Sequence, residues 1–270
     1  MQAYGSGTGR AGERWDSVDL SAPAVELLAT LVNRAGVDRR RRREQPAALA
    51  ELQQAGLLSA DAFLTGRGRR MVEPWRLADR RLALGTRSPG AGTRTAVWAA
   101  DGAALLHSAT ESSRGQEELS VLPLASLVPA LAHRTASLTT GPGTTLAPGE
   151  HQVLLLEDRE YENRINGARL PVPEGAGAQV LGLLESDWTE CTLANESWGG
   201  RFTWITAEGA GIFAVDFLPD GSTALEPMAA TTHQDILMCL VYAVPEQSGS
   251  GPKPRPGAAA GKQLRQQRGH

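Results

Sequence analysis

The chain has 270 residues, of which 41% are hydrophobic and 21% are charged, and its formal net charge is −3. That length allows one large domain or two closely packed ones with a hydrophobic core, and the composition is ordinary for a globular protein. Because no apolar run approaches the ~20 residues of a membrane span and no segment resembles a signal peptide, we expect a cytoplasmic protein without a membrane partner.

The two ends of the chain differ from its body. Residues 1–14 are rich in Gly and Ser, which predicts a flexible leader. Residues 245–270 are dominated by Gly, Pro, Gln and basic side chains, which predicts a disordered basic tail. The tail has a net charge of +4, so the rest of the chain carries about −7, which is atypical of nucleic-acid-binding proteins. Cys191 and Cys239 form no CxxC pair and are predicted to be buried, reduced thiols.

Two helices are expected before the first strand. Ser21 is a suitable N-cap, and apolar residues at helical spacing follow it as far as a stop at Gly36. Pro46 opens a second helix that Gly56 closes. The five consecutive arginines at 39–43 are predicted to form a solvated loop between these helices.

The hydrophobic period then changes to the value of two that is typical of strands. Apolar residues alternate with polar ones at Trp75, Leu77, Leu82 and Leu84. A loop rich in Gly, Pro and Ser is expected at 85–92. Further strands are predicted at 95–100, 103–109 and 118–122, the first two joined by a type I′ turn at Asp101-Gly102. A helix with Pro129 as a cap or kink follows at 124–131.

A Thr/Gly/Pro linker at 136–150 separates this half from a second one. The apolar run 151–156 and the charged stretch 157–164 fit no clear pattern, whereas 175–186 is predicted to be a helix. Strands are predicted at 188–193, 201–206, 211–217 and 223–225, with turns at 198–200, 208–209 and 220–221. A final helix capped by Thr231 or Thr232 completes the half.

The second half thus repeats the order of the first. Residues 95–134 and 203–244 both give two strands around a turn, a further strand, a proline and a helix. The predicted fold is α+β, with two quasi-symmetric copies of a helix–antiparallel strand meander–helix unit packed together. The expected units are a first half at 15–135 and a second half at 151–244.

No constellation of residues in the chain indicates catalysis, so we expect a non-enzymatic protein with no catalytic, cofactor-binding or metal site. The Gly-rich stretch 5–9 follows no predicted strand and lacks the Gly-Lys-Ser/Thr end of a phosphate loop. No GxSxG or HExxH motif is present. The histidines have no metal-ligand spacing; they are His107, His133, His151, His233 and His270.

One alternative is a DNA-binding transcriptional regulator with an amino-terminal winged helix and a duplicated α+β sensing region, and another is an enzyme whose site is assembled from unremarkable residues. The stretch 47–70 resembles the recognition helix and basic wing of winged-helix proteins, and the arginines at 39–43 could contact phosphate. The proposed recognition helix, however, offers only Gln53 and Gln54 to read base edges. Nucleic acid is therefore not the partner we expect first.

The order of the whole chain resembles the EspG family of cytoplasmic chaperones of type VII (ESX) secretion in actinobacteria. The stretches that carry the resemblance are 18–21 leading into 25–28, 49–52 leading into 56–58, Val97-Trp98 with 119–124, and 211–215 with 224–227 and the helix after them. The match is one of pattern and covers residues 15–244.

The resemblance implies a quasi-two-fold α+β protein that binds a secreted helical-hairpin client and holds it in the cytoplasm. Such a role requires an exposed apolar surface rather than a reactive group. The expected contact regions are the loop 86–94 and the final helix. In that helix the candidate client-binding residues are Ile236, Leu237, Leu240 and Val241. The identity of the client and the oligomeric state stay open.

Overall fold

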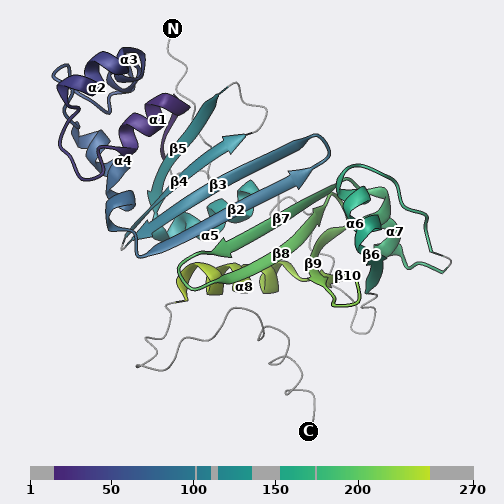
Figure 1. Cartoon of the computed structure of the whole chain (residues 1–270). Helices are drawn as coiled ribbons and strands as arrows, with labels where there is room; N and C mark the ends of the chain where they lie inside the picture. Colours follow the sequence, from purple (N-terminus) through teal and green to yellow (C-terminus); the bar gives the residue numbers. More distant parts are fainter. Residues whose placement is uncertain (1–14, 101, 111–114, 136–152, 174, 244–270) are drawn as a thin grey trace.

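The computed structural model of the chain describes residues 15–100, 102–110, 115–135, 153–173 and 175–243 (Figure 1). Within these residues, ten strands form one sheet in which every neighbouring pair is antiparallel. The strand order is β1-β5-β4-β3-β2-β7-β8-β9-β10-β6. Helices pack on both faces of the sheet, so the predicted α+β class is confirmed.

The first half begins with a strand and four helices and continues with a four-strand meander and a closing helix. Its elements are β1 (Asp16–Ser21), α1 (Ala22–Ala29), α2 (Arg39–Glu44), α3 (Pro46–Gln54), α4 (Gly66–Leu77), β2 (Arg80–Ser88), β3 (Ala91–Ala100), β4 (Ala103–Thr110), β5 (Gln116–Pro123), the 3₁₀ turn η1 (Leu124–Ser126) and α5 (Leu127–Arg134).

The second half has the same order with fewer helices. Its elements are β6 (Leu154–Glu157), α6 (Asp158–Ile165), α7 (Ala178–Glu185), β7 (Trp188–Asn195), β8 (Gly200–Ala207), β9 (Gly211–Phe217), β10 (Ser222–Met228) and α8 (Ala230–Tyr242).

The two halves meet in the middle of the sheet. There β2 pairs with β7, from Leu82 opposite Asn195 to Arg87 opposite Glu190. In each half the first strand returns to pair with the last strand of the meander, so β1 and β6 form the two outer edges. The order of strands is thus symmetric about the β2–β7 pair. That the halves are copies of one duplicated unit stays a prediction.

One face of the sheet is covered by α5 and α8, and its core is built from both halves. Leu131 of α5 and Leu237 of α8 are buried there against Leu84, Leu193 and other residues of the central strands. At about 25 cal/mol per Å² of buried apolar surface, this shared core is a main source of stability for the join between the halves.

The other face carries two separate caps, one at each end of the sheet (Figure 1). Helices α1–α4 cover the end near β1 and β5 and form one core with residues such as Leu20, Leu105 and Leu119. Helices α6 and α7 cover the end near β10 and β6 and form another core around Trp188 and Phe213. The middle of this face lies between the two caps.

Several predictions for the first half are corrected. Strand β1 was not expected, because its six residues contain only two large apolar side chains. The arginine run is helix α2 rather than a loop, since the Asp38 carboxylate caps its first turn and Arg40 pairs with Glu44 four residues on. Helix α1 ends at Ala29, well before Gly36.

The segment around Trp75 is also corrected. Trp75 and Leu77 belong to α4, whose first turn is capped by the Thr65 hydroxyl, and not to a strand. The expected loop at 85–92 is mostly strand, because β2 runs to Ser88 and β3 starts at Ala91. Gly90, with φ +71°, makes the tight turn between them.

In the second half the four predicted strands are present. The charged stretch 157–164, which fitted no clear pattern in the sequence, lies mostly in a helix. Residues 158–165 form α6, which begins with a capping box between Glu157 and Glu160. Helix α8 follows Ala229 and is not capped by a threonine. Cys191 is buried as predicted, but Cys239 is exposed, and both thiols are free. The predicted leader, linker and tail, Asp101, His151 and His270 lie outside the described residues.

Candidate functional site

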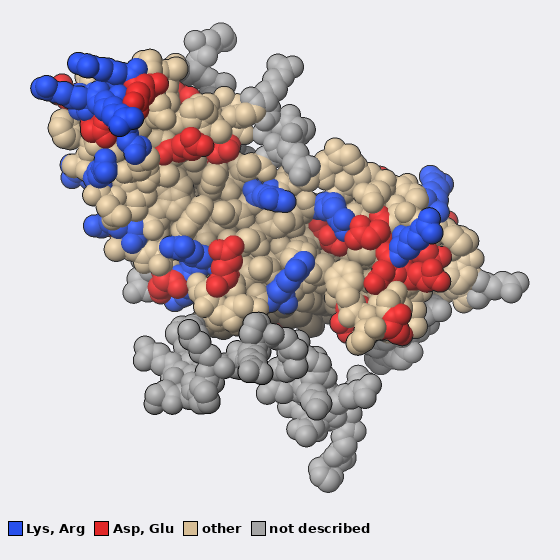
Figure 2. Space-filling view, viewed as in Figure 1, with Lys and Arg blue, Asp and Glu red and all other residues tan. Residues whose placement is uncertain are grey.

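The middle of the sheet face between the two caps is the candidate site. The strands there point mostly small, half-buried side chains at the solvent, and Figure 2 shows a largely uncharged middle on this side of the molecule. We call this surface the open face. Its residues are Ala83, Gly85, Arg94, Ala96, Ala109, Thr192 and Ala194.

Strand register joins these residues into a continuous band. Ala194 lies opposite Ala83, which lies opposite Ala96 on its other side. In the next row, Gly85 lies between Thr192 and Arg94. Directly opposite residues in antiparallel strands point to the same face, so the small side chains are contiguous. The band from β7 to β4 is about 14 Å wide at the usual strand spacing.

The described residues leave open space above Gly85 in the middle of the band. A Cβ atom added at Gly85 would meet no other heavy atom within 4 Å. An α-helix with its side chains is about 10–12 Å across, which matches the width of the band. The arrangement therefore allows a helix to approach the sheet closely.

Aromatic side chains border the open face on the side of the first cap. The Trp98 ring stacks on the His107 ring with centroids 6.2 Å apart, and the Trp75 ring of α4 meets Trp98 edge-on at 5.5 Å. His107 lies opposite Ala96, and its Nε2 is 2.7 Å from the Glu117 carboxylate. These contacts fix an apolar ring surface next to the small residues.

A charged network borders the open face on the other side. Arg87 of β2 binds Glu162 of α6 through two hydrogen bonds of 2.8 and 3.0 Å and also binds Glu190 of β7 at 3.2 Å. The hydrogen bonds to Glu162 raise the pKa of Arg87, and burial raises the pKa of the Tyr161 hydroxyl, which donates to Glu190. Arg87 of the first half thus binds helix α6, which belongs to the cap of the second half.

Three exposed arginines lie at or next to the band without an ion pair among the described residues: Arg81, Arg94 and Arg201. Arg201 is opposite Ala194, and Arg81 is opposite Trp98. A ligand on this face would therefore meet small apolar side chains together with free guanidinium groups.

The four residues predicted to bind a client lie on the opposite side of the sheet. Leu237, Leu240 and Val241 are 0–5% exposed, and Ile236 packs partly buried against the same core. The apolar stripe of α8 is thus the side of the helix that faces the sheet. In this structure it offers no open surface to a client.

The other predicted contact region, 86–94, contributes to the open face in a different way from the one expected. It is the end of a β-hairpin, and only alternate residues such as Arg94 face the band, whereas Thr86 and Thr93 hydrogen-bond to each other at 2.6 Å. Alternation of residue size marks the open face in β2 alone, where the large Leu82 and Leu84 alternate with Ala83 and Gly85. Strands β3 and β7 carry no such signal, because Trp98 shares the parity of Ala96 and Trp188 shares the parity of Ala194.

Among the described residues, no group of three or more His, Cys, Asp or Glu side chains could hold a metal ion. Of the described histidines, His133 is exposed and His107 pairs with Glu117. His233 is buried against Trp204, with ring centroids 4.9 Å apart, and burial lowers its pKa to about 4. Burial raises the pKa of the Cys191 thiol.

The basic features of the DNA-binding alternative lie far from a winged-helix arrangement. The predicted wing is helix α4, and Arg67 within it binds Asp16 and backbone carbonyls rather than facing outward. Two residues of α2, Arg40 and Arg41, are paired with carboxylates of the same segment. The prediction of a wing is wrong, and DNA binding by the α2 arginines stays a prediction.

None of the helices that the structure describes combines the length and the apolarity needed to cross a bilayer. No protein-family model matches the chain, and no curated protein sequence is significantly similar to it.

Proposed function

We propose that the chain is a non-catalytic cytoplasmic chaperone or adaptor of a type VII (ESX) secretion system, and that it holds a helical segment of a secreted client on the open face. The observation that carries the proposal is the band of small side chains between two caps, wide enough for one helix. The resemblance of the chain's element order to the EspG family supports the choice of client.

The chemistry of the face fits this role. Small side chains let a helix approach to about the 10 Å at which packed layers lie in protein cores, so its apolar stripe can be buried. The guanidinium groups of Arg94 and Arg201, which have no ion pair among the described residues, can bind carboxylates on the client, which favours one orientation over the reverse. Neither contribution requires a reactive group.

The test is co-purification with the secreted helical-hairpin protein encoded beside the gene. Replacing Ala83 and Ala96 together by Gln places two long polar side chains at half-buried positions in the band. We expect recovery of the client to fall by about tenfold or more, since close approach of the helix is blocked.

The matched control changes the same residue type at exposed helical positions. Ala29→Gln and Ala125→Gln lie on α1 and η1, outside the open face. This double variant should recover the client as the unmodified chain does. Equal recovery with all three proteins would contradict the proposal, provided that the circular dichroism spectra coincide.

A further inference from the structure

The outermost strand of the second half has an unpaired edge. Among the described strands, β6 hydrogen-bonds only to β10. The Asp158 N–H donates to Gly221 on the β10 side, and the Glu157 N–H donates to the Glu160 carboxylate instead. Since successive N–H groups of a strand point to opposite sides, the Leu155 N–H points to the free edge.

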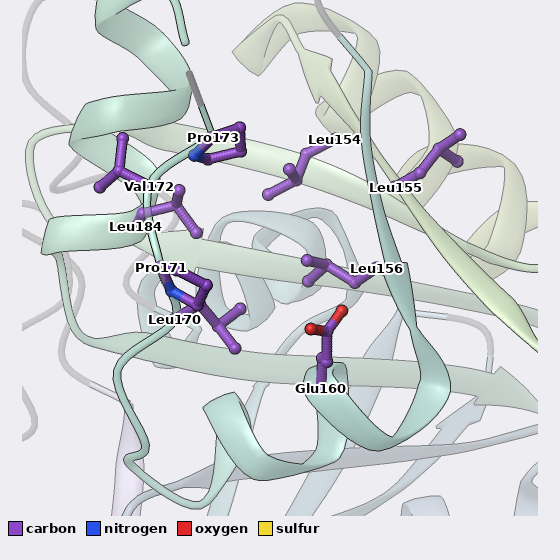
Figure 3. Close-up of a pocket in the computed structure, with 9 residues that line it drawn as sticks. All are labelled: Leu154, Leu155, Leu156, Glu160, Leu170, Pro171, Val172, Pro173 and Leu184. Carbon is purple, nitrogen blue, oxygen red and sulfur yellow. The ribbon is translucent and has the colours of Figure 1, made fainter. Parts of the chain in front are cut away.

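An apolar pocket of about 200 Å³ lies between β6 and the segment 170–173. Leu154 and Leu156 point into it, while Leu155 points away (Figure 3). The remaining lining residues are Glu160, Leu170, Pro171, Val172, Pro173 and Leu184. Around the pocket, large apolar side chains are left in water, because Leu155 is 62% exposed and Val172 is 49% exposed. Exposed apolar side chains beside a free edge are typical of a strand-pairing site.

The face of the sheet on the Leu155 side is acidic. Register places Leu155 opposite Ala224 and Ala224 opposite Asp216, with Glu226 in the neighbouring row of the same face. Neither carboxylate has an ion pair among the described residues. In the described part of the second half, the carboxylates with an arginine partner are Glu162 and Glu190, and that arginine is Arg87 of the first half.

We propose that the free edge of β6 binds an extended segment of a partner protein as an added strand, with apolar residues at alternate positions and Lys or Arg between them. Side chains of one parity would enter the apolar pocket, and those of the other would lie over Leu155, on the sheet face that carries Glu226 on β10 and Asp216 on β9. Pairing of β6 with β6 of a second copy would leave the two Glu226 residues about 14 Å apart, so a dimer through this edge is an outcome that the test below decides. The proposal concerns a different surface from the open face and does not depend on it.

The test uses the full chain and a labelled peptide of about seven alternating Val and Lys residues, a length that matches a typical strand. Fluorescence anisotropy should show saturable binding. A peptide of the same composition with its Val and Lys residues in two blocks should bind about tenfold more weakly, because only alternation satisfies both faces. An alternating Val and Glu peptide should not bind.

Variants of the chain distinguish strand pairing at the β6 edge from non-specific binding of the peptide. Leu155→Pro removes the N–H that faces the free edge and should weaken binding about tenfold, whereas Leu155→Thr keeps it and should retain most of the affinity. Asp216→Asn with Glu226→Gln should also weaken binding about tenfold. The control removes the same charge at exposed residues elsewhere, as Glu196→Gln with Asp235→Asn, and should change affinity little.

Three results would overturn the proposal. They are equal binding of the alternating and block peptides, unchanged binding by Leu155→Pro in a chain with the original unfolding temperature, and a dimer in sedimentation that Leu155→Pro disperses. The last would assign the edge to a second copy of the chain.

Discussion

The two halves share an order of strands but differ in what they present to solvent. In the described residues, the first half carries fifteen arginines against eleven carboxylates, and the second carries four arginines against thirteen carboxylates. The face that the halves share under α5 and α8 is a single apolar core, whereas the capped face has one large helical layer and one small one. The two halves thus share one buried core. They differ in surface charge and in the helices of the capped face, which are the features that a partner would contact.

The caps are also attached in different ways. Arg67 of α4 binds the Asp16 carboxylate and two backbone carbonyls. Arg164 of α6 is 4% exposed, donates to the carbonyls of Ala168, Leu184 and Ser186, and lies 5.1 Å from the centre of the Trp188 ring. The first attachment is an ion pair near solvent, and the second is a buried cation among dipoles.

The largest expected effect tests whether the two halves contribute equally to the stability of the shared core. Leu131→Ala on α5 and Leu237→Ala on α8 should each lower the free energy of unfolding by about 2–5 kcal/mol, because each removes a buried side chain from the same core. Chemical denaturation monitored by tryptophan fluorescence would measure both. A loss for only one variant, or separate unfolding transitions for the halves, would break the equivalence. Leu237→Arg should prevent folding, since it buries a charge.

The next effect is specific to the second half and depends on pH. Because the pKa of His233 is about 4 in the folded chain and ~6.5 when unfolded, the unfolded state binds more protons between these values. The stability due to the neutral ring is complete above pH 6.5 and falls by up to about 3 kcal/mol as the pH drops to 4. His233→Phe should flatten this part of the profile. The same change at exposed His133 on α5 should leave it intact.

The attachment of the caps gives a third, smaller effect. Arg164→Met leaves buried carbonyls without donors and should cost about 2–3 kcal/mol, and Arg67→Met should cost about 1–2 kcal/mol. Raising the salt concentration should reduce the cost of the Arg67 change, because ions screen its pair with Asp16, but not that of the Arg164 change. Identical salt responses in urea titrations would show that the two attachments are equivalent after all.

The smallest effect concerns the contact between the halves. Arg87→Ala removes the partner of Glu162 and Glu190 and should destabilise the chain by about 1–2 kcal/mol, since the guanidinium is partly exposed. Arg94→Ala, an exposed arginine on the neighbouring strand with no ion pair among the described residues, should change stability by less than about 0.5 kcal/mol. Hydrogen exchange of α6 should rise in the Arg87 variant alone.

Local patterns predicted most of the strands and turns. Alternation located β4, β5, β7, β8 and β9, and positive φ at Gly102, Gly199, Gly209 and Gly221 matches the predicted turns. The same approach failed at Trp75 and Leu77, whose spacing of two fits a strand as well as the helix α4. Over so few residues, the two periods cannot be distinguished without the Thr65 cap.

The candidate site could not be predicted in the same way, because it consists of residues that are unremarkable in sequence. Ala83, Ala96 and Ala194 become one surface only when β2 pairs with both β3 and β7. Conversely, the apolar residues of α8 looked suited to a client, yet the fold uses them to bury the sheet. An apolar stripe indicates that a helix face is covered, but it does not identify what covers it.

The sequence by itself determined the α+β class, most of the meander strands and their turns, and the uneven distribution of charge, because these depend on the period, propensity and side-chain chemistry of neighbouring residues. The tertiary structure alone decided that β2 joins β7, that β6 ends the sheet, and which residues face solvent between the caps. Those features depend on pairing between segments up to about a hundred residues apart, such as Arg87 with Glu190, and local patterns carry no information about the partner of a strand.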